Sequence, residues 1–223
     1  MRDSIIYSFG LKHTLKLYLQ HNIYYVADSA CHYIQSQSVL VGGCMWYVVM
    51  AGKGREKIAI EKCRNALSTD AAVNIFAPTY QYLKRYSGKW NLEEDWLFPG
   101  YVFIESNLPN ELEKQLKRIP TTVVPVRIGG GFNPIYEEER AILKMLIDEN
   151  NCIRMSCGII VDNRLIVEKG PLNNCQTYIT RIDRHKRIAE LGIELWKEPR
   201  RIKAGLEVRA KLTASEYDAG RIA

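Results

Sequence analysis

The sequence has little of what catalytic and metal-binding proteins usually contain. Three of its four histidines fall in the first 44 residues, so His185 is the only one in the rest of the chain. The acidic run Glu93–Asp95 has no partnering ligands. No CxxC pair or matching histidine set occurs among the six cysteines, which are Cys31, Cys44, Cys63, Cys152, Cys157 and Cys175. We therefore expect reduced thiols, no metal site and no cofactor.

Signals for an active site are equally scarce. No serine or cysteine pairs with His185 by spacing as a nucleophile would. The "GGGF" segment at Gly129–Phe132 lacks the further glycine and the directly following helix of a nucleotide-binding loop. We expect this segment to be an ordinary loop, and the protein not to be an enzyme.

Long hydrophobic runs are absent as well. The uncharged run Val39–Ala51 is 13 residues long and contains Gly42 and Gly43, whereas a membrane span needs about 20 apolar residues. Val41–Cys44 faintly resembles a lipoprotein cleavage site, but Gln35–Ser38 is polar where an apolar signal core should stand. The sequence therefore favours a soluble, cytoplasmic protein that does not contact a membrane.

The composition is that of a folded protein with an uneven charge distribution. With 47% apolar and 25% charged residues, the 223 residues suffice for one ordinary domain or two small ones. The net charge is +6. Residues 45–150 carry 14 basic and 14 acidic side chains, and residues 151–223 carry 14 and 9. An anionic partner is therefore expected to meet the C-terminal third.

The first 44 residues differ from the rest because they show no sustained helical or strand period. Regular patterning begins just after Met45. Two interpretations stay open: a translation start set too far upstream, with Met45 as the native initiator, or a flexible N-terminal extension.

Residues 45–150 show alternating strand and helix patterns. In order, these predict a strand at Trp46–Ala51, a helix over 55–67, strands at Val73–Tyr82 and Trp96–Glu105 joined by a polar hairpin extension, a helix from Pro109 to Pro120, a strand at Val123–Ile128 and a helix that begins at Glu137. The order β-α-β-β-α-β plus a final helix is that of a ferredoxin-like α+β sandwich.

After a polar junction at Asn150 and Asn151, short strands and turns follow. Arg164–Lys169 is a strand that ends at Gly170-Pro171, Tyr178–Asp183 is another, and Ala189–Leu195 alternates apolar with polar residues or glycine. The segment "RRIKAGLEVRA" supplies short closing strands. A small β-barrel of about 60 residues fits this pattern.

Four stretches in this order carry a family resemblance: "MWYVVMAGKGREKIA", "LFPGYVFIES", "PIYEEE" and "VEKGPLNNCQTYITRIDRHKR". Together they resemble the NusG family of transcription elongation factors, and most closely its specialised LoaP antiterminators. The resemblance implies a ferredoxin-like NGN domain over residues 45–150, a linker over 151–158 and an SH3-like KOW β-barrel over 159–223. The turn that begins the KOW motif falls on Gly170 and Pro171.

The resemblance implies that the NGN domain docks on the coiled-coil clamp helices of the largest RNA polymerase subunit. It implies that the KOW barrel recruits a further partner or nucleic acid. The function it favours is operon-specific processive antitermination in bacteria. A general factor that couples polymerase to Rho or the ribosome, and a ribosome-associated RNA-binding KOW protein, are the alternatives. Thr177 stands where KOW motifs commonly carry a second glycine, which puts the partners Rho and ribosome in doubt.

The proline-glycine pair in "LFPGYVFI" interrupts an aromatic strand. Pro99 lacks a donor and Gly100 a side chain, so a kink there is expected to leave Phe98 and Tyr101 at the edge of the sheet, beside Trp46 and Tyr47 on the first strand. The expected polymerase-binding set is Trp46, Tyr47, Phe98, Pro99, Gly100, Tyr101 and Phe103. The alternative is that its aromatic members are core residues.

A basic cluster surrounds one predicted hairpin tip, at Arg181, Arg184, His185, Lys186 and Arg187. Phosphate neutralisation by such groups releases counterions and favours binding, and the resemblance to LoaP points to the leader RNA hairpin of a target operon. Arg200, Arg201 and Lys203 are candidates to extend the patch. The alternative is a solvated, positively charged turn.

Overall fold

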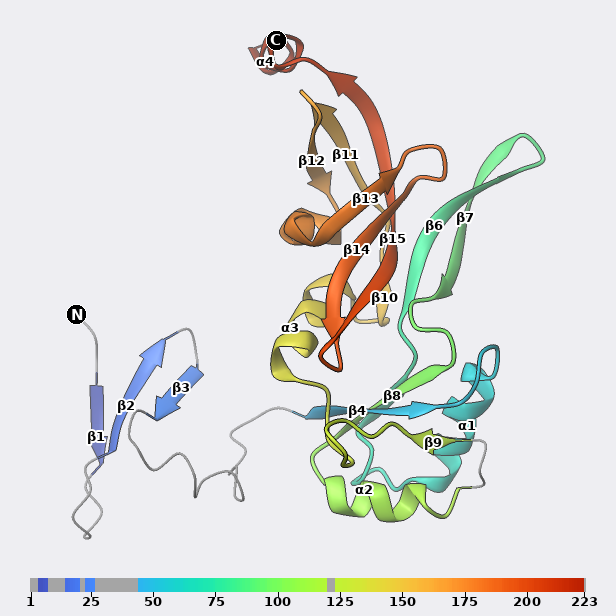
Figure 1. Ribbon diagram of the computed structural model, residues 1–223, viewed down its shortest axis with the longest axis vertical. Helices are drawn as coiled ribbons and strands as arrows, with labels where there is room; N and C mark the ends of the chain where they lie inside the picture. The colour runs from blue at the N-terminus through green and yellow to red at the C-terminus, as the bar shows by residue number, and fades with distance from the viewer. Residues whose placement is uncertain (1–3, 8–14, 21–22, 27–43, 120–122, 223) are drawn as a thin grey trace. The chain divides into compact units, whose positions relative to one another are not determined.

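The computed structural model describes residues 4–7, 15–20, 23–26, 44–119 and 123–222, in two compact units divided after residue 43 (Figure 1). The first unit contains strands β1 (Ser4–Tyr7), β2 (Leu15–Gln20) and β3 (Ile23–Val26), which pair antiparallel in that order. The expectation of no strand pattern in this region is wrong for these segments. The proposed start at Met45 stays a prediction.

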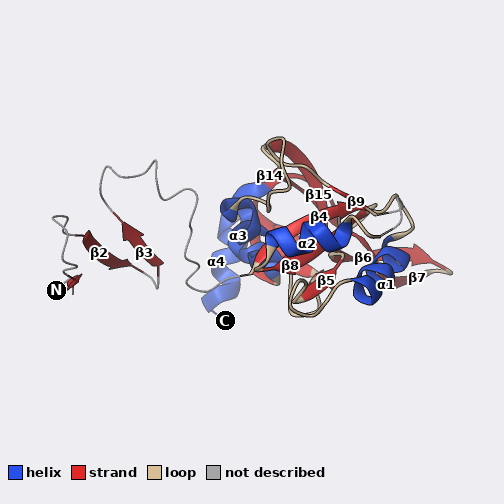
Figure 2. Cartoon of the chain, turned by 90° about the horizontal axis from the view of Figure 1, so that it is seen from below, coloured by secondary structure: helices blue, strands red, loops and turns tan. Residues whose placement is uncertain are grey.

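The larger unit begins with a four-stranded sheet of order β5-β8-β4-β9. Its strands are β4 (Met45–Met50), β5 (Asn74–Phe76), β8 (Tyr101–Ser106) and β9 (Val124–Pro125). Because side chains alternate along a strand, Tyr47 and Val49 face one side and Trp46 and Val48 the other. Helices α1 (Glu56–Ala66) and α2 (Pro109–Leu116) bury the Tyr47 side (Figure 2).

The strand predicted at Val123–Ile128 is shorter than expected, because only Val124 and Pro125 join the sheet. Pro125 has no N–H to donate and therefore suits an edge position. Ile128 instead pairs with Gly131 across a tight turn in which Gly129 and Gly130 have positive φ. The segment Gly129–Phe132 is a loop, as predicted.

The predicted hairpin extension forms a two-stranded arm of β6 (Thr79–Tyr86) and β7 (Lys89–Trp96). Ser87 and Gly88 join the strands with φ of 52° and 76°, the backbone of a tight hairpin turn. Strand β10 (Cys152–Ile153) pairs parallel with β6. Figure 1 shows the arm projecting from the first sheet alongside β15.

Helix α3 (Glu137–Leu146) packs on the Trp46 side of the first sheet through Leu143 and Leu146. Glu137, Glu138 and Glu139 occupy its first turn as predicted, where carboxylates interact favourably with the helix dipole. Beyond α3 the same hydrophobic core continues into the C-terminal sheet without a break.

The C-terminal sheet has five strands in the order β12-β11-β15-β14-β13. They are β11 (Ser156–Val161), β12 (Arg164–Lys169), β13 (Ile179–Asp183), β14 (Ile188–Leu195) and β15 (Glu198–Leu212). The 3₁₀ helix η2 (Pro171–Tyr178) and helix α4 (Ala214–Ile222) complete it. On β14, Ala189, Leu191, Ile193 and Leu195 are buried, as the alternation predicts.

Two expectations for this region need correction. "RRIKAGLEVRA" lies within the single 15-residue strand β15 and does not form several short strands. Its first half pairs with β14 and its second half with β11, so both halves find hydrogen-bond partners without a turn. Residues 151–158, expected as a linker, contain β10 and the start of β11.

The Gly170-Pro171 turn follows β12 where the sequence places it. Gly170 has a φ of +100°, and a Cβ there would overlap Ser156, so only glycine fits. The backbone N–H of Leu172 donates to the Ser156 hydroxyl at 3.2 Å. Thr177 lies inside η2. No helix in the described ranges is long and apolar enough to cross a bilayer.

Candidate functional site

The Pro99-Gly100 break holds the start of β8 against the loop between β4 and α1. Gly100 has a φ of +92°, and a Cβ there would stand 3.1 Å from the Lys53 nitrogen. Its N–H donates to Oε1 of Glu56 at 2.6 Å, and the N–H of Gly54 donates to the same oxygen at 3.1 Å. Glu56 is buried, with 1% of its surface exposed. The glycine at this break therefore allows the backbone at the start of β8 to lie close to the backbone of the β4–α1 loop.

The expected juxtaposition of Tyr101 with Trp46 at a sheet edge is wrong. Strand β8 lies between β5 and β4, and β5 pairs with its residues Phe103–Glu105. The antiparallel register places Tyr101 opposite Met50 and Trp46 opposite Glu105, at the two ends of the strand pair. The kink therefore does not bring Tyr101 beside Trp46.

Most of the aromatic set is core. Trp46, Tyr47, Phe98 and Phe103 are 4%, 3%, 8% and 0% exposed. Trp46 and Phe98 both pack on Phe103, whereas Tyr47 stacks on Phe132 across the opposite face of the sheet. Of the seven candidate residues, only Pro99 and Tyr101 present side chains at the surface. The alternative interpretation as core residues therefore describes the four buried aromatics.

Tyr101 borders a shallow hollow beside the edge strand β9. The hollow is lined by Met50, Tyr101, Val124–Gly129, Trp196, Glu198 and Arg200. Met50 and Val124 are 46% and 45% exposed, so part of the lining is apolar. We call Met50, Tyr101 and Val124 the Tyr101 surface. Sequence reasoning missed Met50 and Val124, because single apolar residues on a strand resemble core.

The turn between β14 and β15 lies on the Tyr101 surface. Trp196 and Lys197 have φ of 61° and 58°, which is uncommon for residues other than glycine. The Trp196 ring lies 5.1 Å from that of Tyr101. The Lys197 N–H donates to the Glu139 carboxylate at 3.0 Å, and its ammonium lies 4.6 Å from the Tyr136 ring. The C-terminal sheet is thus anchored on the first sheet and α3, and it partly covers Tyr101.

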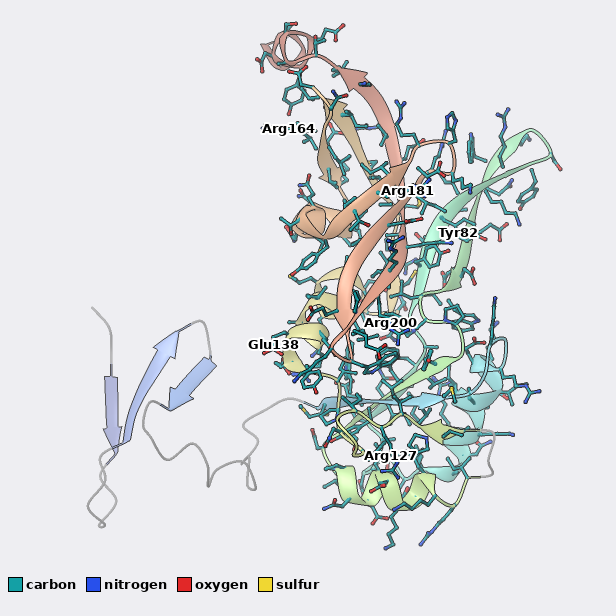
Figure 3. All side chains as sticks on the ribbon, in the orientation of Figure 1. Tyr82, Arg127, Glu138, Arg164, Arg181 and Arg200 are labelled. Atoms are coloured by element: carbon teal, nitrogen blue, oxygen red, sulfur yellow. The ribbon has the colours of Figure 1, made fainter. Side chains whose placement is uncertain are left out.

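The basic cluster lies at the turn between β13 and β14, where Arg184, His185 and Lys186 are exposed. Asp183 accepts the N–H of Lys186 at 2.9 Å, and this hydrogen bond, with the nearby Lys186 ammonium, lowers the pKa of the Asp183 carboxyl. The charged form of Asp183 therefore fixes the turn. Arg181 is exposed on β13, on the same side of the molecule as the turn (Figure 3).

Arg187 is already engaged. Its guanidinium forms an ion pair with Glu207 at 2.6 Å and lies 4.0 Å from the centre of the Trp90 ring. Its φ of 54° is again left-handed. Arg187 therefore connects the turn to the arm, whereas Arg181, Arg184, His185 and Lys186 of the predicted cluster are exposed.

The structure does not join Arg200 and Arg201 to this turn. Gly205 pairs with Ile188, next to the turn, whereas Arg201 pairs with Gly192 and Arg200 with Ile193. Arg201 lies four positions before Gly205 on β15, a distance of roughly 13 Å. Figure 3 shows Arg181 and Arg200 at different levels of the sheet. The prediction that Arg200 and Arg201 extend the patch is wrong, because Arg200 lies 5.1 Å from the Trp196 ring instead.

Among the described residues, no three His, Cys, Asp or Glu side chains come together as metal ligands.

Two residues that organise the site were not predicted from the sequence. Glu56 had a signal, because an acidic residue opens a helix two positions after Gly54 in "GKGRE". Trp196 had none.

Comparison with known proteins identifies the first part of this unit. Residues 45–145 match the family model described as NusG, transcription termination factor nusG. We call residues 45–145 the NusG-family domain, after the family model that they match.

One curated relative matches beyond the NusG-family domain. It is the transcription termination/antitermination protein NusG of Lactococcus lactis subsp. lactis (strain IL1403), which is 24% identical over 149 residues, or 63% of this chain and 80% of the relative. A solved structure described as "Domain interaction in Thermotoga maritima NusG" is 18% identical, with a TM-score of 0.42 over 72% of this chain and 93% of that chain.

Proposed function

We propose that this protein is a bacterial, cytoplasmic, operon-specific processive antiterminator of the LoaP type. The observation that carries the proposal is the NusG-family domain at residues 45–145, followed by a five-stranded sheet with an exposed basic turn. The domain would bind elongating RNA polymerase. The sheet, which we assign as the KOW domain, would contact the leader RNA of chosen operons.

The Tyr101 surface is the proposed contact for the clamp helices of polymerase. It combines one aromatic ring with the exposed apolar side chains of Met50 and Val124, and aromatic residues supply much of the anchoring energy at protein interfaces. The buried Trp46, Phe98 and Phe103 belong to the core against which Tyr101 packs. Pro99 and Gly100 fix where β8 begins.

The β13–β14 turn is the proposed RNA contact. Arg181, Arg184, His185 and Lys186 are exposed there, and neutralising phosphates with such groups releases counterions. RNA binding would select the operon, and the bound factor would hold the polymerase clamp closed. Suppression of pausing is then a shift in the population of polymerase conformations and not a chemical step.

Polymerase binding is tested with the full chain, because the core of the NusG-family domain continues into the C-terminal sheet. Met50→Ala should weaken its affinity for polymerase several-fold. Met145→Ala is the matched control, because Met145 on α3 is 47% exposed and Met50 is 46% exposed. Equal affinities for the two variants would remove the Tyr101 surface from the proposal.

Operon specificity is tested by transcription in vitro on a template with its natural leader and on one without the leader hairpin. We expect readthrough of a downstream terminator only on the first template. The second candidate is a general factor that couples polymerase to Rho or the ribosome, because the name of the Lactococcus lactis relative includes termination. Equal effects on both templates would favour that candidate.

A further inference from the structure

We infer that the arm and the β13–β14 turn form one RNA surface that takes unpaired nucleotides. This inference rests on the proposed RNA contact and specifies its ligand. The two-part surface consists of Lys84, Arg85, Tyr86, Lys89 and Trp90 at the arm tip and Arg184, His185, Lys186 and Arg187 at the turn. The sequence predicts only a solvent-exposed hairpin at the arm.

Two contacts hold the arm and the turn together. The Arg187 guanidinium lies 4.0 Å from the centre of the Trp90 ring, and its ion pair with Glu207 fixes its position. Farther along, a Cβ on Gly205 would overlap the Gln81 carbonyl oxygen and the Met155 sulfur. Strand β15 thus meets β6 at a glycine, which allows close approach. Figure 1 shows the arm beside the β13–β14 hairpin.

The surface has an excess of positive charge. Its two tips contribute six lysines and arginines. Fewer acidic groups lie beside them: Asp183 pairs with Lys186, Glu207 pairs with Arg187, and Glu93 accepts the Tyr86 hydroxyl. Within the described part of the chain, Lys84, Arg85, Lys89 and Arg184 form no ion pair. Two basic tips fixed side by side suit a polyanion that passes over both.

The exposed rings specify what kind of nucleic acid fits. Trp90 and Tyr86 are 37% and 48% exposed at the arm tip. Packing in a hydrophobic core therefore does not account for aromatic residues at these two positions. The Tyr86 hydroxyl donates to Glu93 at 3.0 Å, which orients its ring. Aromatic rings among cations are stacking platforms for bases, and a base can stack on a ring only when it is not enclosed in a duplex.

The strand register assigns roles within the arm. Arg85 pairs directly with Trp90, so these two side chains lie on the face of the arm that meets Arg187. Tyr86 and Lys89 form the next pair, on the opposite face at the very tip, so the inferred surface runs from the turn across Trp90 and over the tip to Tyr86. Each exposed ring thus has a cation beside it. A base stacked on Trp90 would leave its phosphate within reach of Arg85, and the strand would continue towards Arg184 and Lys186.

The test measures binding of the full chain to two fluorescein-labelled probes, a single-stranded dodecauridylate and a blunt twelve-base-pair RNA duplex. The double variant Tyr86→Ala, Trp90→Ala should weaken binding of the dodecauridylate at least about fivefold, because each base stack contributes roughly 1–3 kcal/mol. Binding of the duplex should change less than about twofold. Trp90→Phe should restore part of the loss. Leu92→Ala, which removes an exposed apolar side chain from the same arm, is the control.

The outcomes separate this inference from the proposed function. If Arg184→Ala, Lys186→Ala weakens binding of both probes and the arm variant weakens neither, the two-part surface is wrong and the RNA contact of the turn stands. Binding of neither probe by the unaltered chain also overturns the inference, while the leader-deletion experiment still decides the proposed function on natural RNA. If the full chain binds dodecathymidylate more tightly than dodecauridylate and the arm variant loses this binding, the ligand of the two-part surface is single-stranded DNA and not RNA.

Discussion

The backbone N–H of Gly100 donates to the carboxylate of Glu56 at 2.6 Å, across 44 residues of chain. The same oxygen accepts the N–H of Gly54, and Ala51 donates its N–H to the Gly100 carbonyl at 2.8 Å. One buried carboxylate thus closes the β4–α1 loop onto the start of β8. This arrangement explains why a proline-glycine pair interrupts an aromatic strand, and it positions Tyr101.

Removal of this carboxylate should destabilise the fold. Glu56→Ala leaves two backbone N–H groups without their acceptor in a buried place, and each such loss costs about 1–3 kcal/mol. Urea denaturation should show a loss of about 2–4 kcal/mol in the free energy of unfolding. Glu61→Ala, an exposed position on the same helix, should change it by less than about 0.5 kcal/mol. Similar values for both variants would contradict the role of Glu56.

A side chain at Gly100 should destabilise the fold more than one at Gly88. Both residues have positive φ, but a Cβ on Gly88 meets open space and one on Gly100 meets the Lys53 nitrogen at 3.1 Å. We expect Gly88→Ala to cost about 1 kcal/mol from the backbone conformation alone. Gly100→Ala should cost about 1–2 kcal/mol more because of the steric overlap. Equal destabilisation in thermal or urea unfolding would show that the loop adjusts without strain.

Trp196 should compete with polymerase for Tyr101. Because its ring lies 5.1 Å from Tyr101, a helix that docks on the Tyr101 surface must first displace the β14–β15 turn. Trp196→Ala removes a ring pair worth roughly 1 kcal/mol, so affinity for polymerase should rise about fivefold. Trp196→Phe should give a smaller rise. Weaker binding by Trp196→Ala would indicate that Trp196 belongs to the polymerase contact.

The β13–β14 turn and the Arg200 region should respond differently to removal of charge. Arg184→Ala, Lys186→Ala should weaken leader RNA binding and reduce the magnitude of the log–log salt slope by about 0.7–0.9 for each phosphate that is no longer neutralised. Arg200→Ala, Arg201→Ala removes the same number of charges farther along β15, next to Trp196, and should leave the slope unchanged. A salt titration in which the Arg200, Arg201 variant changes the slope and the Arg184, Lys186 variant does not would indicate that RNA contacts the β14–β15 turn.

Asp148 should make the fold sensitive to acid. Burial raises the pKa of this carboxyl. The N–H groups of Cys152 and Asn150 and the Arg154 guanidinium together lower the pKa by more than burial raises it, so the pKa lies below its ordinary value. A carboxyl with a depressed folded pKa stabilises the fold above its unfolded pKa of about 3.9 and loses that contribution as pH falls. Asp148→Asn should therefore lose less stability between about pH 5 and pH 3 than the unaltered chain. Parallel stability curves would exclude this role.

Local chemistry made much of the fold predictable. The polar segment between two strand patterns forms the hairpin of the arm, and three glutamates after Tyr136 begin α3 where a helix dipole favours them. The alternation along Ala189–Leu195 fixed which face of β14 is buried. In each case the interactions that decide the structure lie within a few residues of one another.

The failures involve contacts between distant segments. An aromatic strand pattern does not tell which faces are covered by other elements, so Trp46, Tyr47, Phe98 and Phe103 appeared as candidates for binding although all are buried. The length of β15 was missed because its two halves pair with different strands. The basic residues Arg200 and Arg201 were grouped with a turn from which the strand register separates them.

By itself, the sequence determined the order of strands and helices in residues 45–150, the polar hairpin extension, the turn at Gly170-Pro171, the surplus of positive charge after residue 150 and the resemblance to NusG. Each follows from residue type and short-range spacing. Only the tertiary structure decided that Trp196 lies against Tyr101 and that Arg187 stacks on Trp90. Those partners are more than 90 residues apart in the chain, so their meeting depends on how the C-terminal sheet packs on the NusG-family domain and its arm, which no local pattern encodes.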